Sequence, residues 1–223
     1  MSEFIMNFLN TYNDILPVIL MSLFVSLSAT VIASIVGIGA GVPAALRDFK
    51  FKKIILRITD TLMGIPPVLM GLIVYLLISR KGPLGAFELL FTPTAMIIAQ
   101  IMLILPIIFG LTVSNLSKTA PEVEKTCLAL GAEKKDIYRT IINESKIQLL
   151  TVVTLGFGRA ISEVGAVMMV GGNIKGFTRV MTTYIALETG KGNFNGAIAI
   201  GIVLLIISFM LNFLLHRFQG REA

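Results

Sequence analysis

Long apolar runs alternate with short polar segments along almost the whole of this 223-residue chain. A helix needs about 20 predominantly apolar residues to cross the hydrocarbon core of a bilayer, and several runs reach that length. The pattern predicts five transmembrane helices, at about 15–45, 58–79, 93–117, 147–171 and 194–216. A helix satisfies its own backbone hydrogen bonds in lipid. We therefore expect an all-α, polytopic membrane protein.

The composition agrees with this pattern. Hydrophobic residues make up 55% of the chain and the mean hydropathy is +0.87, whereas soluble domains rarely exceed about half. No soluble domain or low-complexity stretch separates the spans, so residues 1–223 are expected to form one membrane domain. No Lys or Arg precedes Arg47, and a secretory signal peptide begins with a basic segment. The first run is therefore predicted to be a retained span.

The basic residues predict the orientation. Thirteen lie on one side of the predicted spans, namely Arg47, Lys50, Lys52, Lys53, Arg57, Lys118, Lys125, Lys134, Lys135, Arg139, Lys146, Arg217 and Arg221. Five lie on the other side, namely Arg80, Lys81, Lys175, Arg179 and Lys191. Basic loops stay in the cytoplasm. We therefore expect a cytoplasmic-membrane protein with its N-terminus outside and its C-terminus inside. The net charge of +6 then reports topology, and no nucleic-acid partner is expected.

A polar insert at about 118–146 lies between the third and fourth predicted spans, on the cytoplasmic side. Pro121 suits the first turn of a helix, and Gly131 is expected to end that helix in a left-handed conformation. An apolar stripe is predicted on this first helix, formed by Val123, Cys127 and Leu130. A second helix should follow, with an apolar face of Ile137, Tyr138, Ile141 and Ile142. Two amphipathic helices joined by a turn favour a docking element over a solvated loop.

This insert resembles the "EAA" motif of ABC importer permeases, E-A-A-x3-G-x9-I-x-L-P. Gly131 and Ile141 match in register, whereas Lys125 occupies the place of the family's Glu and Glu124 lies one residue early. The resemblance implies a coupling helix that seats in a groove of an ATPase subunit. The residues that would dock there are Glu124, Lys125, Leu128, Ala129, Leu130, Gly131 and Ala132.

The chain lacks the G-x-x-x-x-G-K-[ST] pattern that cradles nucleotide phosphates. We therefore expect a transport subunit that is not an enzyme and that carries no cofactor of its own. ATP and Mg would be held by the separate ATPase. With Cys127 and His216 as its single Cys and His, the chain is also expected to hold no metal site and no internal disulfide.

Wider stretches narrow the resemblance. "GIPPVLMGLIVYLLISRKGPLG" and "GRAISEVGAVMMVGGNIKG" are similar to the tungstate branch of the molybdate/tungstate permeases. That family implies a type I importer core, a homodimer, two ATPase subunits and an extracytoplasmic oxyanion-binding protein. Many of its permeases carry six spans, and the pattern here predicts five. Three alternatives stay open: a permease for molybdate, sulfate, phosphate or an amino acid; a passive channel; and an intramembrane enzyme, which the scarcity of His and Cys disfavours.

Two sites within the spans are candidates for the pathway or its gate. Pro66 and Pro67 remove two backbone donors and should kink or break span two, either to line a pathway or only for packing. Arg159 and Glu163 are four residues apart in span four and could form an ion pair on one helix face. A self-neutralising structural pair is favoured there over a direct contact with substrate.

The segment between spans four and five lies outside the cell in this topology. Lys175 and Arg179, with Thr178, Thr182 and Thr183, offer hydrogen-bond donors suited to an oxyanion or to an acidic surface of the binding protein. A solvated connector is the alternative interpretation.

Overall fold

A computed structural model describes the backbone of residues 2–219 and the side chains of 15–211, 213 and 217. Described residues form helices and turns, without strands. The helices are α1 (Ser2–Leu46), α2 (Lys52–Met63), α3 (Pro67–Ile78), the short 3₁₀ helix η1 (Gly85–Phe87), α4 (Pro93–Ala129), α5 (Lys134–Glu144), α6 (Lys146–Ile161), α7 (Gly165–Gly171), α8 (Met181–Gly190) and α9 (Phe194–Gln219).

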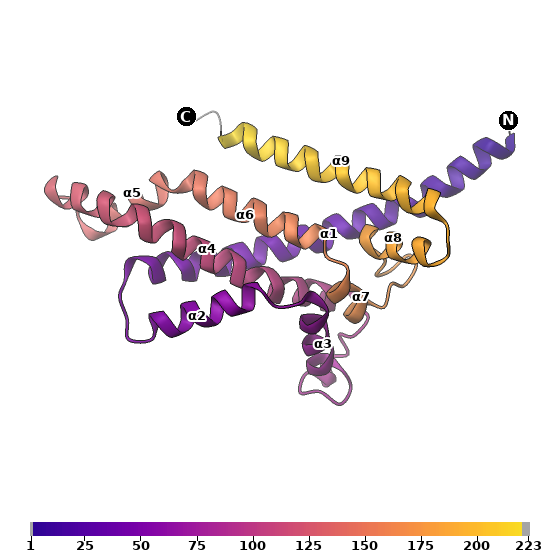
Figure 1. Cartoon of the computed structure of the whole chain (residues 1–223), viewed down its shortest axis with the longest axis horizontal. Helices are drawn as coiled ribbons and strands as arrows, with labels where there is room; N and C mark the ends of the chain where they lie inside the picture. The colour runs from indigo at the N-terminus through magenta and orange to yellow at the C-terminus, as the bar shows by residue number, and fades with distance from the viewer. Residues whose placement is uncertain (1, 220–223) are drawn as a thin grey trace.

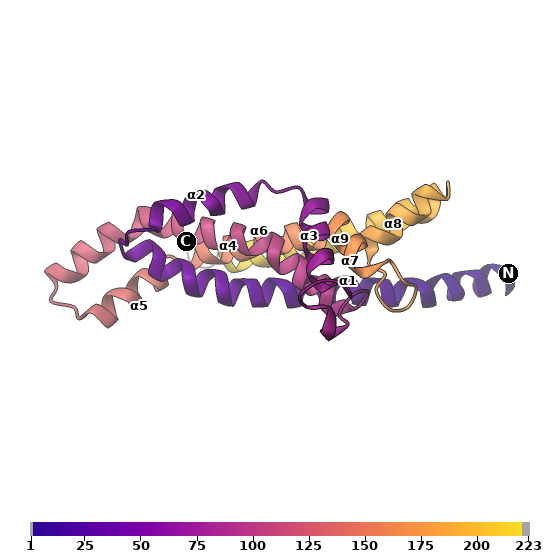
Figure 2. The same cartoon turned by 90° about the horizontal axis from the view of Figure 1, so that it is seen from below.

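The helices form an elongated bundle (Figures 1 and 2). In both views α1, α4 and α6 run along the long axis, while α3 runs across it. The α4–α5 turn lies at one end of the bundle, and α8 lies toward the other. The predicted cytoplasmic insert and the predicted outer segment are therefore far apart.

Three single helices among the described residues are long and apolar enough to cross a membrane, and there are up to five spans if each of two bent helix pairs counts as one. The single helices cover Ile15–Leu46, Pro93–Ala129 and Phe194–Leu211. Large apolar side chains such as Ile35 and Leu205, both 70% exposed, lie on the outer surface of α1 and α9. Lipid is the environment that such surfaces require. The protein is therefore a multi-pass membrane protein.

Span two is broken, as the two prolines predict. The axes of α2 and α3 meet at 106°. Pro66 is extended and precedes the first residue of α3, Pro67, where a missing N–H removes no helical bond. A twelve-residue helix rises only about 18 Å. Because α3 turns across the bundle, the span predicted over 58–79 consists of two short helices, the first of which begins at Lys52.

Span four is also broken, which corrects the expectation of one continuous helix over 147–171. The axes of α6 and α7 differ by 57°. The break comes at Ser162, Glu163 and Val164, because no residue from Ser162 to Val164 is helical. Arg159 is in the last turn of α6 and Glu163 is beyond its end. The two residues therefore do not share one helix face.

The central core packs α1, α3, α4, α6 and α7 around buried side chains that include Val25, Val74, Ile108 and Val167. Close approach of α1 and α4 depends on small residues. A Cβ atom on Gly37 would lie 2.9 Å from Ile108 Cγ2, and one on Gly41 would lie 2.8 Å from Thr112 Cγ2. Small residues bring helix backbones together in membranes, where no hydrophobic effect drives association.

Candidate functional site

The turn at Gly131 joins α4 to α5 through a Schellman motif. Gly131 has φ +74°, so the predicted left-handed conformation is confirmed. Its N–H donates to Leu128 O at 3.0 Å, and the Ala132 N–H donates to Cys127 O at 3.0 Å. These bonds satisfy the last carbonyls of α4. Only a residue that tolerates positive φ ends the helix in this way.

The helix before this turn begins earlier than predicted. Pro121 lies inside α4, which continues unbroken from the membrane span to Ala129. Proline removes one hydrogen bond and frees the carbonyl four residues before it, on Ser117. Ser117 is exposed, so that carbonyl can be solvated, while the buried residues Ala120 and Cys127 hold the helix on its neighbours. Packing therefore overrides the expected helix start.

The insert packs on the bundle through a smaller core of its own. Ile137 and Ile141 of α5 are buried in one cluster with Leu116 of α4 and Val42 of α1, as expected for its apolar face. Arg47 Nε also donates to Tyr138 Oη at 3.1 Å. Ile142, which was predicted on the same face, is 43% exposed, because it lies about 100° around the helix from Ile141.

The tip of the insert exposes apolar surface. Leu128 is 58% exposed and Leu130 is 81% exposed, so Leu130 is not part of the packed stripe predicted with Val123 and Cys127. Glu124 and Lys125 are also exposed, as are Ala129 and Gly131, and Ala132 is half-buried. Exposed leucines ringed by charges are typical of a surface that another protein covers.

The two broken spans meet at their breaks. Pro67 is followed by Val68, whose Cγ2 would lie 2.6 Å from a Cβ on Gly165, the first residue of α7. One turn further along α3, a Cβ on Gly71 would lie 2.6 Å from Ala166 Cα. The structure therefore brings the Pro66–Pro67 break beside the break that contains Glu163. No sequence spacing indicates this contact.

The predicted ion pair is confirmed within this region. Arg159 Nη1 lies 3.2 Å from Glu163 Oε2, with side-chain exposures of 36% and 3%. The other oxygen, Glu163 Oε1, accepts from the Ala166 N–H at 3.1 Å. The Thr182 hydroxyl of α8 donates to Glu163 O at 2.7 Å. Glu163 therefore ties together the end of α6, the start of α7 and α8, which supports a structural role for the pair.

The outer segment differs from its prediction at the three threonines. Thr178 is 1%, Thr182 6% and Thr183 0% exposed. Their hydroxyls donate to the main-chain carbonyls of Gly171, Glu163 and Val180, respectively. They are therefore not available to an oxyanion. The three hydroxyls donate to main-chain carbonyls because the segment folds tightly between α7 and α8.

Basic residues, in contrast, surround a small cavity in this segment. Lys175 is exposed, and Arg179 is fixed by two hydrogen bonds to Asn173, from Nε to Oδ1 at 3.1 Å and from Nη2 to the main-chain oxygen at 3.2 Å. Both line a cavity of about 240 Å³ together with Glu188 and Lys191. Basic residues therefore gather at this end of the molecule and can attract anions.

Residues 33–222 match the family described as the binding-protein-dependent transport system inner membrane component. The chain belongs to this family. Its permease architecture is that of a type I ABC importer, and it is a transport component.

Three relatives of this permease are informative. It is 46% identical over 206 residues to the tungstate uptake system permease protein TupB of Peptoclostridium acidaminophilum, with 92% of this chain and 90% of that protein covered. It is 43% identical over 175 residues to the protein of the same name from Campylobacter jejuni, covering 77% and 72%. A probable anion ABC transporter permease protein of Haloferax volcanii is 39% identical over 205 residues, covering 90% and 88%.

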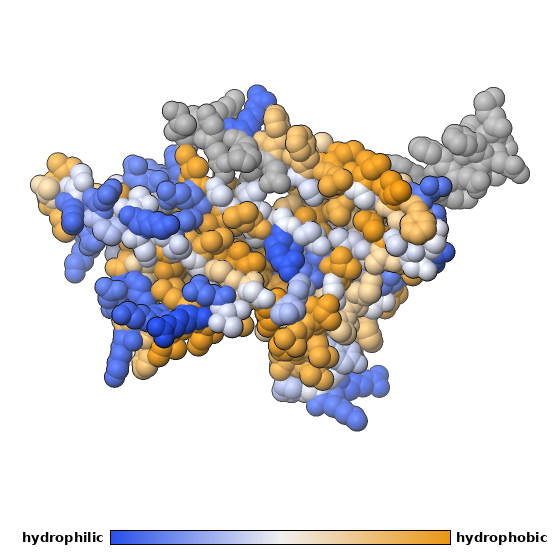
Figure 3. Space-filling view, in the orientation of Figure 1, coloured by the Kyte–Doolittle hydropathy of each residue, from blue (hydrophilic) through white to orange (hydrophobic). Residues whose placement is uncertain are grey.

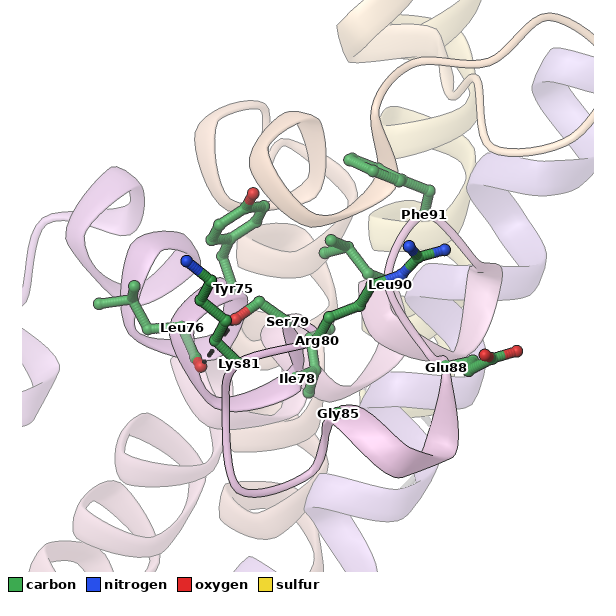
Figure 4. A pocket seen from close by; sticks show the side chains of 10 residues that line it. All are labelled: Tyr75, Leu76, Ile78, Ser79, Arg80, Lys81, Gly85, Glu88, Leu90 and Phe91. Carbon is green, nitrogen blue, oxygen red and sulfur yellow. Dashed lines mark hydrogen bonds between the residues drawn. The ribbon is translucent and has the colours of Figure 1, made fainter.

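Sequence reasoning missed two features of the permease. Gln100 is buried in α4, and its Nε2 donates to Ala160 O at 3.0 Å, beside the span-four break. An amide inside an apolar span was a visible signal, because such residues pair within the bundle. The second feature is a cavity of about 730 Å³ at the end of α3 and in the connection from α3 to α4, shown in Figure 4. Arg80, Lys81 and Glu88 line it. From the sequence, Arg80 and Lys81 indicated only the orientation of the spans.

The carboxyl of Glu188, outside the membrane-spanning helices, gives a pH prediction for the permease. Hydrogen bonds from Lys191 at 2.8 Å and Asn193 at 2.7 Å hold its pKa below the ordinary value of 4.5. A lowered folded-state pKa stabilises the fold above the unfolded-state pKa, and this is lost as pH falls through the folded value. The melting temperature of the permease should therefore fall between neutral pH and a pH below 4.5, and it should fall less in Glu188→Gln than in the unaltered protein. An unchanged difference would contradict the assigned hydrogen bonds.

Proposed function

We propose that this permease is the membrane subunit of an ATP-driven importer for tungstate. The observation that carries the proposal is the likeness to two tungstate uptake permeases, 46% and 43% identical, over most of both chains. The anion class has separate support from the Haloferax volcanii relative. Molybdate is the second candidate, because it is a tetrahedral dianion like tungstate and a pathway that only passes the ion needs no tight site.

The exposed tip of the insert is proposed to couple the permease to ATP hydrolysis. Two ATPase subunits, which hold ATP and Mg, would each receive the tip of one permease in a homodimer. The exposed leucines Leu128 and Leu130 would enter a groove of the ATPase, and Glu124 and Lys125 would contact its rim. Because α4 is continuous from the tip into the membrane, movement of the tip would be transmitted directly to the core.

The opposite end is proposed to face an extracytoplasmic oxyanion-binding protein. Lys175 and Arg179 give this end positive charge, which suits an acidic docking surface. The pathway would pass the adjoining breaks at Pro66–Pro67 and at Arg159–Glu163. Small residues and broken helices tolerate rearrangement there better than continuous helices.

Reconstitution tests the proposal. Proteoliposomes that contain the permease, its ATPase and its binding protein should accumulate tungstate only with ATP and binding protein present. Competition with molybdate and sulfate, together with the affinity of the binding protein for each, should identify the preferred ion. Uptake of neither tungstate nor molybdate would remove the oxyanion assignment.

The proposed orientation leads to a labelling prediction. Lys50 is exposed in the loop before α2. On a Cys127→Ser background, Lys50→Cys should resist a membrane-impermeant thiol reagent in intact cells and react after permeabilisation. Lys81→Cys, exposed in the loop after α3, is the matched control and should react in intact cells. The reverse pattern would invert the topology.

A further inference from the structure

Helix α2 presents three faces of different character. One face packs on α4, where a Cβ atom on Gly110 would lie 3.0 Å from Thr59 Cγ2. A second face is apolar at Ile55 and Ile58, which are 40% and 54% exposed. The third face is exposed and polar, and its residues are Lys53, Arg57, Asp60 and Thr61. The spacing i, i+4, i+7 and i+8 keeps these four on one side of the helix. Figure 3 shows hydrophilic and apolar surface side by side along this part of the molecule.

The polar face of α2 reaches into the membrane-spanning part of the bundle. Thr59 lies level with Gly110 of α4. The first charged residue of α4 is Lys118, eight residues beyond Gly110, and eight residues of helix span about 12 Å. Asp60 directly follows Thr59. Since the hydrocarbon core of a bilayer is about 30 Å thick, Asp60 lies at hydrocarbon depth.

Lipid is an unsuitable neighbour for this face. Within the described part of the chain, the side chains of Lys53, Arg57 and Asp60 make no ion pair and no hydrogen bond. Long basic side chains can extend to the membrane surface, but the carboxylate of Asp60 is too short to do so. Charged residues within spans are costly in hydrocarbon and face a bundle interior or a water-filled cavity. The exposed carboxylate of Asp60 therefore requires a polar environment.

The polar face leads to the two helix breaks. Beyond Thr61, the exposed residues Gly64 and Pro66 carry the same surface to the end of α2. The break at Pro66 adjoins the break in span four, where the Arg159 side chain is 36% exposed. An exposed track therefore runs from Lys53, near the start of α2, to the place where the broken spans meet.

We propose that the charged face of α2 lines a water-filled half of the oxyanion pathway, between the two breaks and the end of the bundle that carries the α4–α5 turn. The proposal rests on the proposed function of the permease. Arg57 attracts the anion, and Asp60 keeps the attraction weak enough for release. Water fits this face better than a dry contact with a second copy, because two cations and one carboxylate on each copy would leave charge unpaired.

Thiol accessibility tests whether the face is wet. On a Cys127→Ser background in lipid nanodiscs, Asp60→Cys and Thr61→Cys should react with a charged methanethiosulfonate at least about tenfold faster than Ile58→Cys, because a charged reagent does not enter hydrocarbon. Ile58 is the matched control, since it lies two residues before Asp60, at similar depth but about 160° around the helix. Reactivity should be measured without nucleotide and with a non-hydrolysable ATP analogue.

The role of Arg57 is tested by the charge preference of this reaction. At Thr61→Cys, an anionic reagent should react faster relative to a cationic one, and Arg57→Gln should lower this ratio by about threefold or more. Arg57→Lys should keep it. Lys50→Gln is the matched control, because Lys50 is exposed in the preceding loop, eleven residues before Thr61 and beyond the screening length of about 8 Å. Tungstate uptake should fall by a similar factor in Arg57→Gln and stay unchanged in Lys50→Gln.

Three results would overturn the proposal: an unreactive Asp60→Cys in both nucleotide states, equal reactivity at Ile58→Cys, or an unchanged charge ratio and unchanged uptake in Arg57→Gln. Disulfide formation between two copies at Asp60→Cys, without reaction with the charged reagent, would assign the face to a protein interface instead. Failure of the proposed function is distinguishable. Uptake of a different solute with the labelling pattern intact would reject the tungstate importer and keep the wet face, whereas normal tungstate uptake with an unreactive face would reject the face alone.

Discussion

Gly131→Val should abolish the stimulation of ATP hydrolysis by loaded binding protein, while the permease still inserts in the membrane. The left-handed conformation at Gly131, with φ +74°, costs a residue with a Cβ roughly 1–2 kcal/mol, and more when the side chain is β-branched. One to two kcal/mol is a factor of about 5–30 in a conformational equilibrium. Nothing lies within 4 Å of an added Cβ, so the effect comes from the backbone and not from a clash.

A matched substitution separates these causes. Gly131→Asn adds a side chain of similar size, and asparagine tolerates the left-handed region. It should keep most of the stimulation. Glu124→Gln should have a smaller effect than Gly131→Val, because an exposed charge at a rim contributes little. The measurement is ATP hydrolysis by the reconstituted complex, with copurification of the ATPase as a second readout. Normal stimulated hydrolysis in Gly131→Val would refute the coupling role of this turn.

Arg159→Gln should reduce tungstate uptake severely, and adding Glu163→Gln should recover much of the loss. Removal of one partner from a buried ion pair costs about 3–5 kcal/mol, because the other charge is left unpaired. The cost here should be lower, since Arg159 is 36% exposed and partly solvated. In the double variant no unpaired charge remains, and the amide oxygen introduced by Glu163→Gln can still accept from the Ala166 N–H.

The comparison of single and double variants decides the role of Arg159. Uptake of tungstate and molybdate into proteoliposomes should be measured beside the thermal stability of each complex. A structural pair predicts that stability and uptake fall together in Arg159→Gln and recover together in the double variant. Equal loss of uptake in Arg159→Gln and in the double variant, with Glu163→Gln nearly normal, would make Arg159 a substrate-binding residue instead.

Much of the fold was accessible from local patterns. Apolar runs located the spans because lipid imposes a length on every helix that crosses it. Gly131 and the Pro66–Pro67 pair were interpretable because glycine permits a positive φ, while proline fixes φ and lacks an N–H, whatever surrounds them. Local rules failed at Pro121, where burial of Ala120 and Cys127 on neighbouring helices keeps α4 continuous.

The arrangement of the sites was decided by tertiary packing. The chain separates Val68 from Gly165 by almost a hundred residues, and only the contact of α3 with α7 brings the two broken spans together. The same holds for the outer cavity, whose lining comes from three segments. The sequence determined that Lys175, Arg179 and Lys191 carry positive charge on one side of the membrane. Tertiary packing decided which neighbours these residues contact. It also decided that the threonines beside them point inward and bond to the backbone, which no local periodicity encodes.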